Sequence, residues 1–204
     1  MAKTWENFFT LVQPHVSGCP EVVIENHLRQ ASVDFCERSE VWRRRLETDY
    51  TIQGVSDYEL SVPNNALLEN ITSLFIDGLP ARRVSDFNIE NYPDTAEGRP
   101  QYFSMHEDAE VRLYPTPDAR YSLKTDCVLK PGLEATGVED FIFRTHRQCI
   151  AYGALGTLMI IPGKEWTNPE LATYYSLKFN KSCDDAKGRD NRRSGMRVRY
   201  RNFA

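Results

Sequence analysis

The sequence predicts an α+β protein: a helix bundle from N- and C-terminal helices, with an inserted antiparallel β domain and an extended C-terminal arm. Three observations predict this class. Apolar residues recur every three or four positions toward both ends of the chain, which is typical of amphipathic helices. In the middle, apolar and polar residues alternate between turn-forming residues, which is typical of strands. The last residues are strongly basic.

The domain boundaries follow from these changes in pattern. We expect residues 1–41 and 132–186 to form the helical bundle, residues 42–131 the inserted β domain and residues 187–204 the arm. Neither helix pair is long enough to bury its apolar stripe alone, so packing the first pair against the last gives one core. The five cysteines are widely scattered, and we expect them to be free thiols.

Two helices are predicted before the β domain. The first covers the sequence TWENFFTLV from Thr4, and Pro14 ends it. Pro20 suits the first turn of the second helix, where its missing N–H is not needed. Apolar residues of this second helix recur at the spacing of about five amphipathic turns; they are Val23 or Ile24, His27 or Leu28, Ala31 and Phe35.

The β domain is predicted from turns and alternation. Asp77-Gly78 lies between two apolar runs, which is a strong hairpin signal. Three further strands are expected at Tyr102–Met105, Glu110–Tyr114 and Arg120–Leu129. The polar segment 86–98 is expected to be a long exposed loop, and loops of this length are often functional. For the run Arg43–Arg45, a solvated strand face is favoured over a nucleic-acid contact.

Two more helices are predicted after the β domain. In the first, the small residues Ala151, Gly153, Ala154 and Gly156 permit close contact with another helix, and Pro162-Gly163 ends it. In the second, Asn168 is the expected N-cap and Pro169 the first helical residue.

Enzyme chemistry is not indicated. The motifs GxGxxG, GxxxxGK[ST] and GxSxG do not occur. His146 and Cys149 share a helix face, but a packed cysteine beside a partly exposed histidine explains this spacing better than a nucleophile and its base. His15, Cys19 and Cys36 match no known metal-finger spacing. We therefore expect no catalytic residue, no metal site and no cofactor.

The C-terminal arm raises the main functional question. Residues 187–204 contain seven basic residues and one acid, a net charge of +6, whereas the rest of the chain has 18 basic and 28 acidic residues, a net charge of −10. Met196, Val198 and Tyr200 alternate with arginines, so an extended strand would carry one apolar and one basic face. This pattern favours a docking arm for another protein. A nucleic-acid arm and a solubilising tail remain as alternatives.

The order of several motifs suggests a family. The motifs are YELSVP with Tyr58, Leu60 and Pro63, then LFIDGLPARRV, RPQYF, VRLYPTPDARYSL and AYGALGTLMIIPGKEWTNPELATYY, followed by the basic arm. In this order, over residues 20–204, the chain resembles the head-to-tail connector (adaptor) proteins of tailed bacteriophages.

The resemblance implies a non-enzymatic viral structural protein of the virion neck, assembled in the host cytoplasm and without a membrane partner. Copies would form a ring, commonly a dodecamer, beneath the portal protein, with genomic DNA passing through it and tail or nozzle proteins beyond it. The alternatives are a nucleic-acid-binding module that uses the arm, and a neighbouring tail-completion (stopper) protein.

The resemblance also assigns residues to these contacts. The implied portal-binding residues are Lys187, Arg189, Arg192, Arg193, Met196, Arg197, Val198, Arg199, Tyr200, Arg201 and Phe203. The predicted loop is a candidate for contact with a neighbouring subunit or a tail protein through Asp86, Asn88, Glu90, Tyr92, Asp94 and Glu97.

Overall fold

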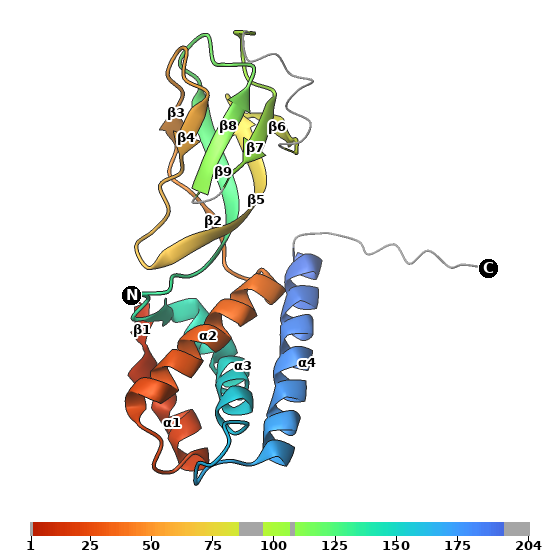
Figure 1. Cartoon of the computed structure of the whole chain (residues 1–204). Coiled ribbons are helices and arrows are strands. Elements are labelled where there is room, and N and C mark those ends of the chain that lie inside the picture. Colours follow the sequence, from red (N-terminus) through yellow and green to blue (C-terminus); the bar gives the residue numbers. More distant parts are fainter. Residues whose placement is uncertain (1, 86–95, 107–108, 194–204) are drawn as a thin grey trace, which may run out of the picture. The chain divides into compact units, whose positions relative to one another are not determined.

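The computed structural model describes residues 2–85, 96–106 and 109–193, the last four of these for their backbone only. It is an α+β protein, as the sequence predicts, with helices and antiparallel-rich sheets (Figure 1). Contacts divide the chain into two compact units, a helical unit of residues 1–41 and 131–204 and a β unit of residues 42–130. Each unit is described by itself below.

The helical unit begins with short elements rather than the single regular helix that the sequence predicts. Strand β1 (Ala2–Thr4) is followed by the 3₁₀ helix η1 (Trp5–Phe8), the single turn α1 (Phe9–Val12) and the 3₁₀ helix η2 (Gln13–His15). Ahead of these turns, β1 pairs antiparallel with β10 (Gly137–Glu139). The Trp5 indole donates to the carbonyl of Ala135 at 2.9 Å, which ties this end to a distant segment.

Glycine is required where β1 meets β10. A Cβ atom at Gly137 would lie 2.0 Å from the carbonyl oxygen of Lys3, so no other residue fits unless the backbone moves.

Helix α2 (Glu21–Ser39) confirms the second predicted helix. It begins directly after Pro20, and Ile24, Leu28, Ala31 and Phe35 are all buried. The helix ends at Glu40, whose φ of 54° is the left-handed conformation common at helix C-termini. Burial of this apolar stripe explains why the sequence forms a long helix here.

Helices α3 (Asp140–Leu158) and α4 (Pro169–Arg193) complete this unit. The expected close approach of the helices is confirmed, since a Cβ at Gly153 would lie 2.9 Å from Ala31 of α2 and from Phe179 of α4. A Cβ at Gly156 would lie 2.6 Å from the Ser176 hydroxyl. The predicted cap is also confirmed, because the Asn168 side-chain oxygen accepts from the N–H of Leu171 at 3.1 Å.

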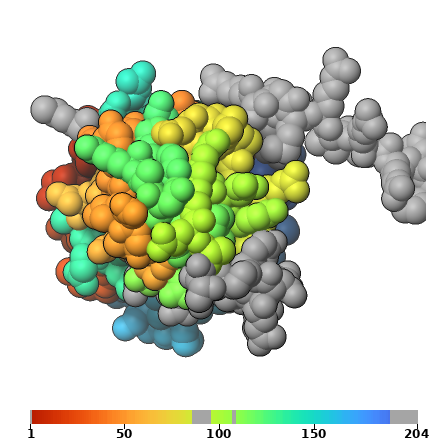
Figure 2. All heavy atoms as spheres, turned by 90° about the horizontal axis from the view of Figure 1, so that it is seen from above, coloured from red at the N-terminus to blue at the C-terminus, as the bar shows by residue number. Residues whose placement is uncertain are grey.

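The β unit contains one eight-stranded sheet in the order β2-β9-β5-β6-β7-β8-β4, with β3 also paired to β9. Strand β9 pairs antiparallel with β2 and β3, β8 pairs antiparallel with β4 and β7, and β5 pairs antiparallel with β6, whereas β6 and β7 are parallel. In the space-filling view of Figure 2, segments of this unit that are far apart in sequence (orange, yellow and green) lie side by side in one surface. The strands are β2 (Arg43–Arg45), β3 (Asp49–Tyr50), β4 (Asp57–Glu59), β5 (Ala66–Ile76), β6 (Leu79–Arg83), β7 (Tyr102–Met105), β8 (Glu110–Tyr114) and β9 (Ser122–Pro131).

The predicted hairpin is confirmed. Strands β5 and β6 pair with Ile76 opposite Leu79, and Asp77 and Gly78 both have positive φ angles, 49° and 77°. Two positive φ angles are what a two-residue turn between twisted strands requires. The last predicted strand is shifted, since β9 runs from Ser122 to Pro131 instead of starting at Arg120.

Candidate functional site

The C-terminal half of α4 is the described part of the predicted basic arm. Cys183 and Ala186 are buried, so this part of the helix packs on the helical unit. Beyond them, Lys187 Nζ lies 2.8 Å from Oε1 of Glu40, the residue that ends α2. The buried positions and this ion pair hold this part of α4 on the other helices of the unit.

The structure moves the start of the arm. The sequence predicts an extended arm from Lys187, whereas α4 continues to Arg193, so that part of the prediction is wrong. The physical reason is that each added helical residue gains a backbone hydrogen bond once the preceding turn is packed, and Lys and Arg are good helix formers. Arg189 also donates from Nε to the carbonyl of Asp185 at 3.3 Å.

The remaining arm residues are not described. Arg192 and Arg193 end α4, but the structure describes only their backbone. The two-faced ribbon therefore stays a prediction, because its residues lie outside the described part of the chain; these are Met196, Arg197, Val198, Arg199, Tyr200, Arg201 and Phe203.

Most of the candidate contact loop also lies outside the described residues, namely Asp86, Asn88, Glu90, Tyr92 and Asp94. Glu97 is described: it is exposed and forms a single β-bridge with Thr116. The N–H of Gly98 donates to the Thr116 carbonyl at 2.9 Å, so the return of this segment to the sheet is fixed. The contact role of the loop stays a prediction.

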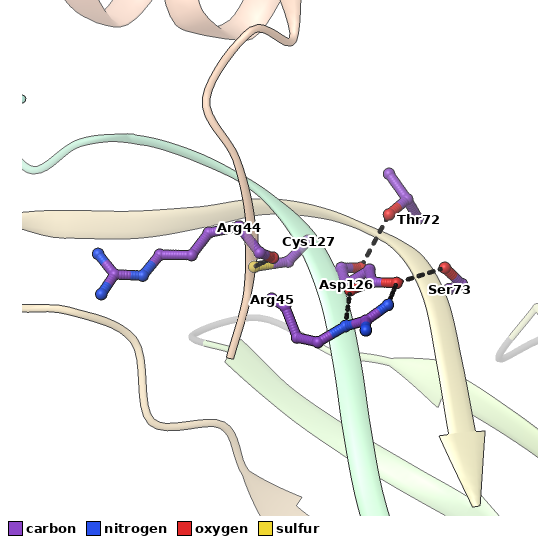
Figure 3. Close-up of polar contacts among 6 residues, drawn as sticks. All are labelled: Arg44, Arg45, Thr72, Ser73, Asp126 and Cys127. Atoms are coloured by element: carbon purple, nitrogen blue, oxygen red, sulfur yellow. Dashed lines mark hydrogen bonds and ion pairs between the residues drawn. The ribbon is translucent and has the colours of Figure 1, made fainter. Parts of the chain in front are cut away.

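The arginine run occupies strand β2, which pairs with β9 (Figure 3). Arg45 forms a bidentate ion pair with Asp126, with N–O distances of 2.6 and 2.8 Å. Asp126 also accepts from the hydroxyl of Ser73 at 3.4 Å, and its carbonyl accepts from Thr72 at 2.9 Å. In Figure 3 the Arg44 side chain points away from this network.

The network around Asp126 has a structural role. The hydrogen bond and the charge of Arg45 hold the pKa of the Asp126 carboxyl below its usual range. Since the Arg45 side chain is 63% exposed, solvent screens the pair and its contribution to stability is small. The charge of Arg45 is thus neutralised within the β unit.

His146 and Cys149 do not form a reactive pair. Cys149 is buried, and its hydrogen bond with Cys183 and its burial raise the pKa of the Cys149 thiol, which disfavours the reactive thiolate. The ring of His146 packs against Phe35 with centroids 4.8 Å apart, and burial lowers the pKa of His146, with Arg189 adding to the shift.

The other candidate ligands are also engaged elsewhere. His15 Nδ1 lies 3.4 Å from the hydroxyl of Tyr175, and burial raises the pKa of Cys36 far above its ordinary value. Among the residues that the structure describes, no group of three or more His, Cys, Asp or Glu side chains is placed to hold a metal ion. None of the described helices combines the length and apolar character that crossing a bilayer requires.

Sequence reasoning missed two features. The partner of Lys187 is Glu40, which is 147 positions away, so no local pattern could indicate the pair. A surface pocket in the β unit is lined by Arg82, Arg99 and Tyr102 among others, and the segments carrying them are not contiguous in sequence. The only indication of this pocket in the sequence was the two consecutive arginines, Arg82 and Arg83, that follow the hairpin turn.

The fold and the site define a class of protein. It is an α+β protein with a basic segment at the C-terminal end of α4, where Lys187 pairs with Glu40, and its cysteines are buried. The sequence model of the family described as SU10 adaptor protein matches residues 13–199, which is nearly the whole chain. The chain therefore belongs to this family of phage head-to-tail adaptors. A comparison with curated proteins found no match.

Proposed function

We propose that this chain joins the portal of a tailed phage to its tail, gripping the portal with residues 187–204. The observation that carries the proposal is the family match over residues 13–199, which makes the chain a phage structural adaptor and implies a component of the virion neck. The helical unit is proposed to be a bundle into which the β unit is inserted. Tail or nozzle proteins attach on the side away from the portal.

The anchored end of α4 supports this use of the arm. The Lys187–Glu40 ion pair holds the base of the basic segment on the folded unit, so residues beyond Arg193 start from a defined point. A single short segment binds weakly because ordering it costs conformational entropy. A ring of copies, such as a dodecamer, offers many arms at once and raises the effective concentration of each.

The charge distribution is consistent with DNA passing through such a ring. Outside residues 187–204 the chain has 18 basic and 28 acidic residues, and a net negative wall repels the DNA backbone. DNA would then slide along the channel instead of binding to it.

The test is portal binding by a chain that lacks residues 194–204. This truncation keeps α4, Lys187 and the rest of the described chain, so the body stays folded while the predicted ribbon is removed. We expect portal binding to be lost, measured by co-sedimentation of the two purified proteins. Portal binding equal to that of the full chain would contradict the proposal.

Two matched variants separate protein docking from DNA binding. Replacing Met196, Val198 and Tyr200 with serine removes the apolar set, and replacing Arg197, Arg199 and Arg201 with glutamine removes the basic set. A docking ribbon needs both sets, so both variants lose portal binding. A nucleic-acid arm depends on the arginines alone and shows DNA affinity that falls steeply with salt. That second result would favour the alternative function.

A further inference from the structure

Two arginines of the β unit line a surface pocket of about 420 Å³. The pocket lies where β6 meets β7, and Leu79, Pro100, Gln101 and Tyr102 complete most of its lining. Arg82 is exposed, and its backbone N–H donates to the carbonyl of Gln101 at 2.8 Å, which fixes the strand that carries it. We call Arg82 and Arg99 the arginine pair.

Neither member of the arginine pair has a hydrogen-bonded carboxylate among the described residues, although Asp77 is near enough for the Arg99 charge to help lower the pKa of its carboxyl. Arg99 donates from Nη2 to the carbonyl of Ile76, which fixes the guanidinium, but its Nε is buried and has no hydrogen-bond acceptor. Within the described parts of the chain, neither Arg82 nor Arg99 forms an ion pair. Arg82 is exposed, so its guanidinium is the member of the pair that an incoming carboxylate can reach, and Arg99 adds positive charge beside it.

Two glutamates of the same unit lie close together and have no ion-pair partner among the described residues. Glu59 of β4 and Glu110 of β8 are directly opposite each other in an antiparallel pair, and both are exposed. Side chains directly opposite in such a pair share one face of the sheet, and like charges there repel. Neither carboxylate forms an ion pair within the described residues. We call these two residues the acidic pair.

The two pairs cannot satisfy each other within one copy. Tyr114 of β8 is opposite Tyr102 of β7, which in turn is opposite Arg82, so the arginine pair lies at the Tyr114 end of β8. Glu110 is at the other end of that strand. Four residues along a strand cover about 13 Å, and two strand spacings add about 10 Å across the sheet.

We propose that the arginine pair of one copy binds the acidic pair of the next copy. Each site supplies the charge that the other lacks, and Arg with carboxylate forms short, charge-assisted hydrogen bonds. Because the two surfaces differ, the contact is head-to-tail, and repeating it closes a ring when the rotation allows. This inference deepens the proposed function, since it rests on ring assembly and names the surfaces that build the ring.

The contact also has an apolar component. Leu79 at the edge of the pocket is 55% exposed although it is a large apolar residue. A neighbouring copy that covers the pocket would remove this side chain from water, which favours association. The ion pairs then set the register of the two copies, and the apolar contact adds affinity.

Sedimentation velocity of the full chain over a concentration series tests the proposal. Reversing the acidic pair with E59K and E110K should abolish the larger species, and both positions are exposed, so the fold is kept. The variant R82E should do the same without touching the Arg99–Ile76 hydrogen bond. A full chain that stays monomeric up to its solubility limit overturns the proposal.

Charge exchange gives the decisive comparison. A chain that carries E59K, E110K, R82E and R99E together should recover the larger species. Mixing an E59Q/E110Q chain with an R82Q chain should yield a species of two chains and nothing larger, because only one of the two interfaces keeps its full set of opposite charges. Failure of the exchanged chain to recover, with its thermal unfolding unchanged, would exclude this pairing.

Two controls keep the outcomes separate. R120E and E47K reverse exposed charges elsewhere in the β unit and should leave self-association unchanged; an equal loss would mean that net charge alone decides. Each variant keeps its arm, so weak portal binding by single copies should persist, without the gain that a ring of arms provides. A chain lacking residues 194–204 should still self-associate, which separates failure of this inference from failure of the portal-binding proposal.

Discussion

The two units of this chain are stabilised in different ways. In the helical unit, small residues allow close helix contact, so that a Cβ at Gly153 would lie 2.9 Å from both Ala31 and Phe179. In the β unit, ion pairs such as Arg112 with Asp57 connect neighbouring strands. Both units bury an apolar core, but the close helix contacts make the helical unit the more sensitive to added volume, and the paired carboxylates give the β unit a modest response to acid.

This difference agrees with the proposed roles. A unit that carries a docking arm needs a rigid base, which close packing provides. A unit that contacts neighbouring copies through charged surfaces can assemble reversibly, because exposed ion pairs are individually weak. Four experiments test this difference between the two units, and they are given in order of decreasing expected effect.

The largest effect is expected from L28A in α2. Leu28 is fully buried, and removing such a side chain costs about 2–5 kcal/mol in the free energy of unfolding. Hydrogen exchange resolved by segment should show faster exchange in α2, α3 and α4 and no change in β5 or β9. The control is V22A on the same helix, since Val22 is 66% exposed and its loss should have little effect. Equally faster hydrogen exchange in both units would contradict the difference described between them.

The next largest effect is expected from G153A in α3. The added methyl group would overlap Ala31 and Phe179, and overpacking of this kind costs about 1–3 kcal/mol. Chemical denaturation followed by circular dichroism measures the loss. Q148A, at an exposed position of the same helix, is the matched control. A G153A chain as stable as the control would mean that the helices do not approach this closely.

The acid response of the β unit should be smaller. Hydrogen bonds from Arg112 and from Arg45 lower the pKa of Asp57 and of Asp126. A lowered carboxyl pKa contributes stability that is present above the unfolded value of about 3.9 and is lost as the pH falls below it. The chain with D57N and D126N should lose this dependence. Its hydrogen exchange in the β unit should increase less as the pH falls below that value than in the unsubstituted chain. D185N on α4 serves as the control, and a pH dependence identical to that of the unsubstituted chain would refute the assignment.

The smallest effect is expected from two histidines of the helical unit. Burial lowers the pKa of His27 and of His146, so their neutral forms are favoured in the folded state. Stability is then complete above the unfolded value of about 6.5 and decreases as the pH falls through it. We expect exchange in α2 and α3 to rise modestly in this window and the β unit to stay unchanged. The H27Q/H146Q chain should show no such rise, and a rise of the same size in it would contradict the prediction.

Much of the fold could be predicted because it depends on neighbours in sequence. Pro20 and Asn168 mark helix starts, and the two helices begin next to them. The Asp77-Gly78 turn depends only on which residues tolerate positive φ angles. The first predicted helix forms as short helical turns from Trp5 to His15, and what could not be predicted is the strand β1 before them, because its partner β10 is distant in sequence.

The candidate site was predicted less completely. The position of the basic segment followed from composition, yet its extended start at Lys187 was wrong because the packed end of α4 continues the helix to Arg193. Composition reports charge but not whether a preceding turn is buried. The ribbon beyond Arg193 and the loop from Asp86 remain predictions.

The sequence by itself determined the helix starts, the hairpin turn and the contrast between a basic end and an acidic body, since each depends on residues a few positions apart. Only the tertiary structure decided that Lys187 meets Glu40, that β6 runs parallel to β7 beside the arginine pair, and that Glu59 is opposite Glu110. The reason is physical: these pairs are set by strand register and helix packing, which depend on the whole core.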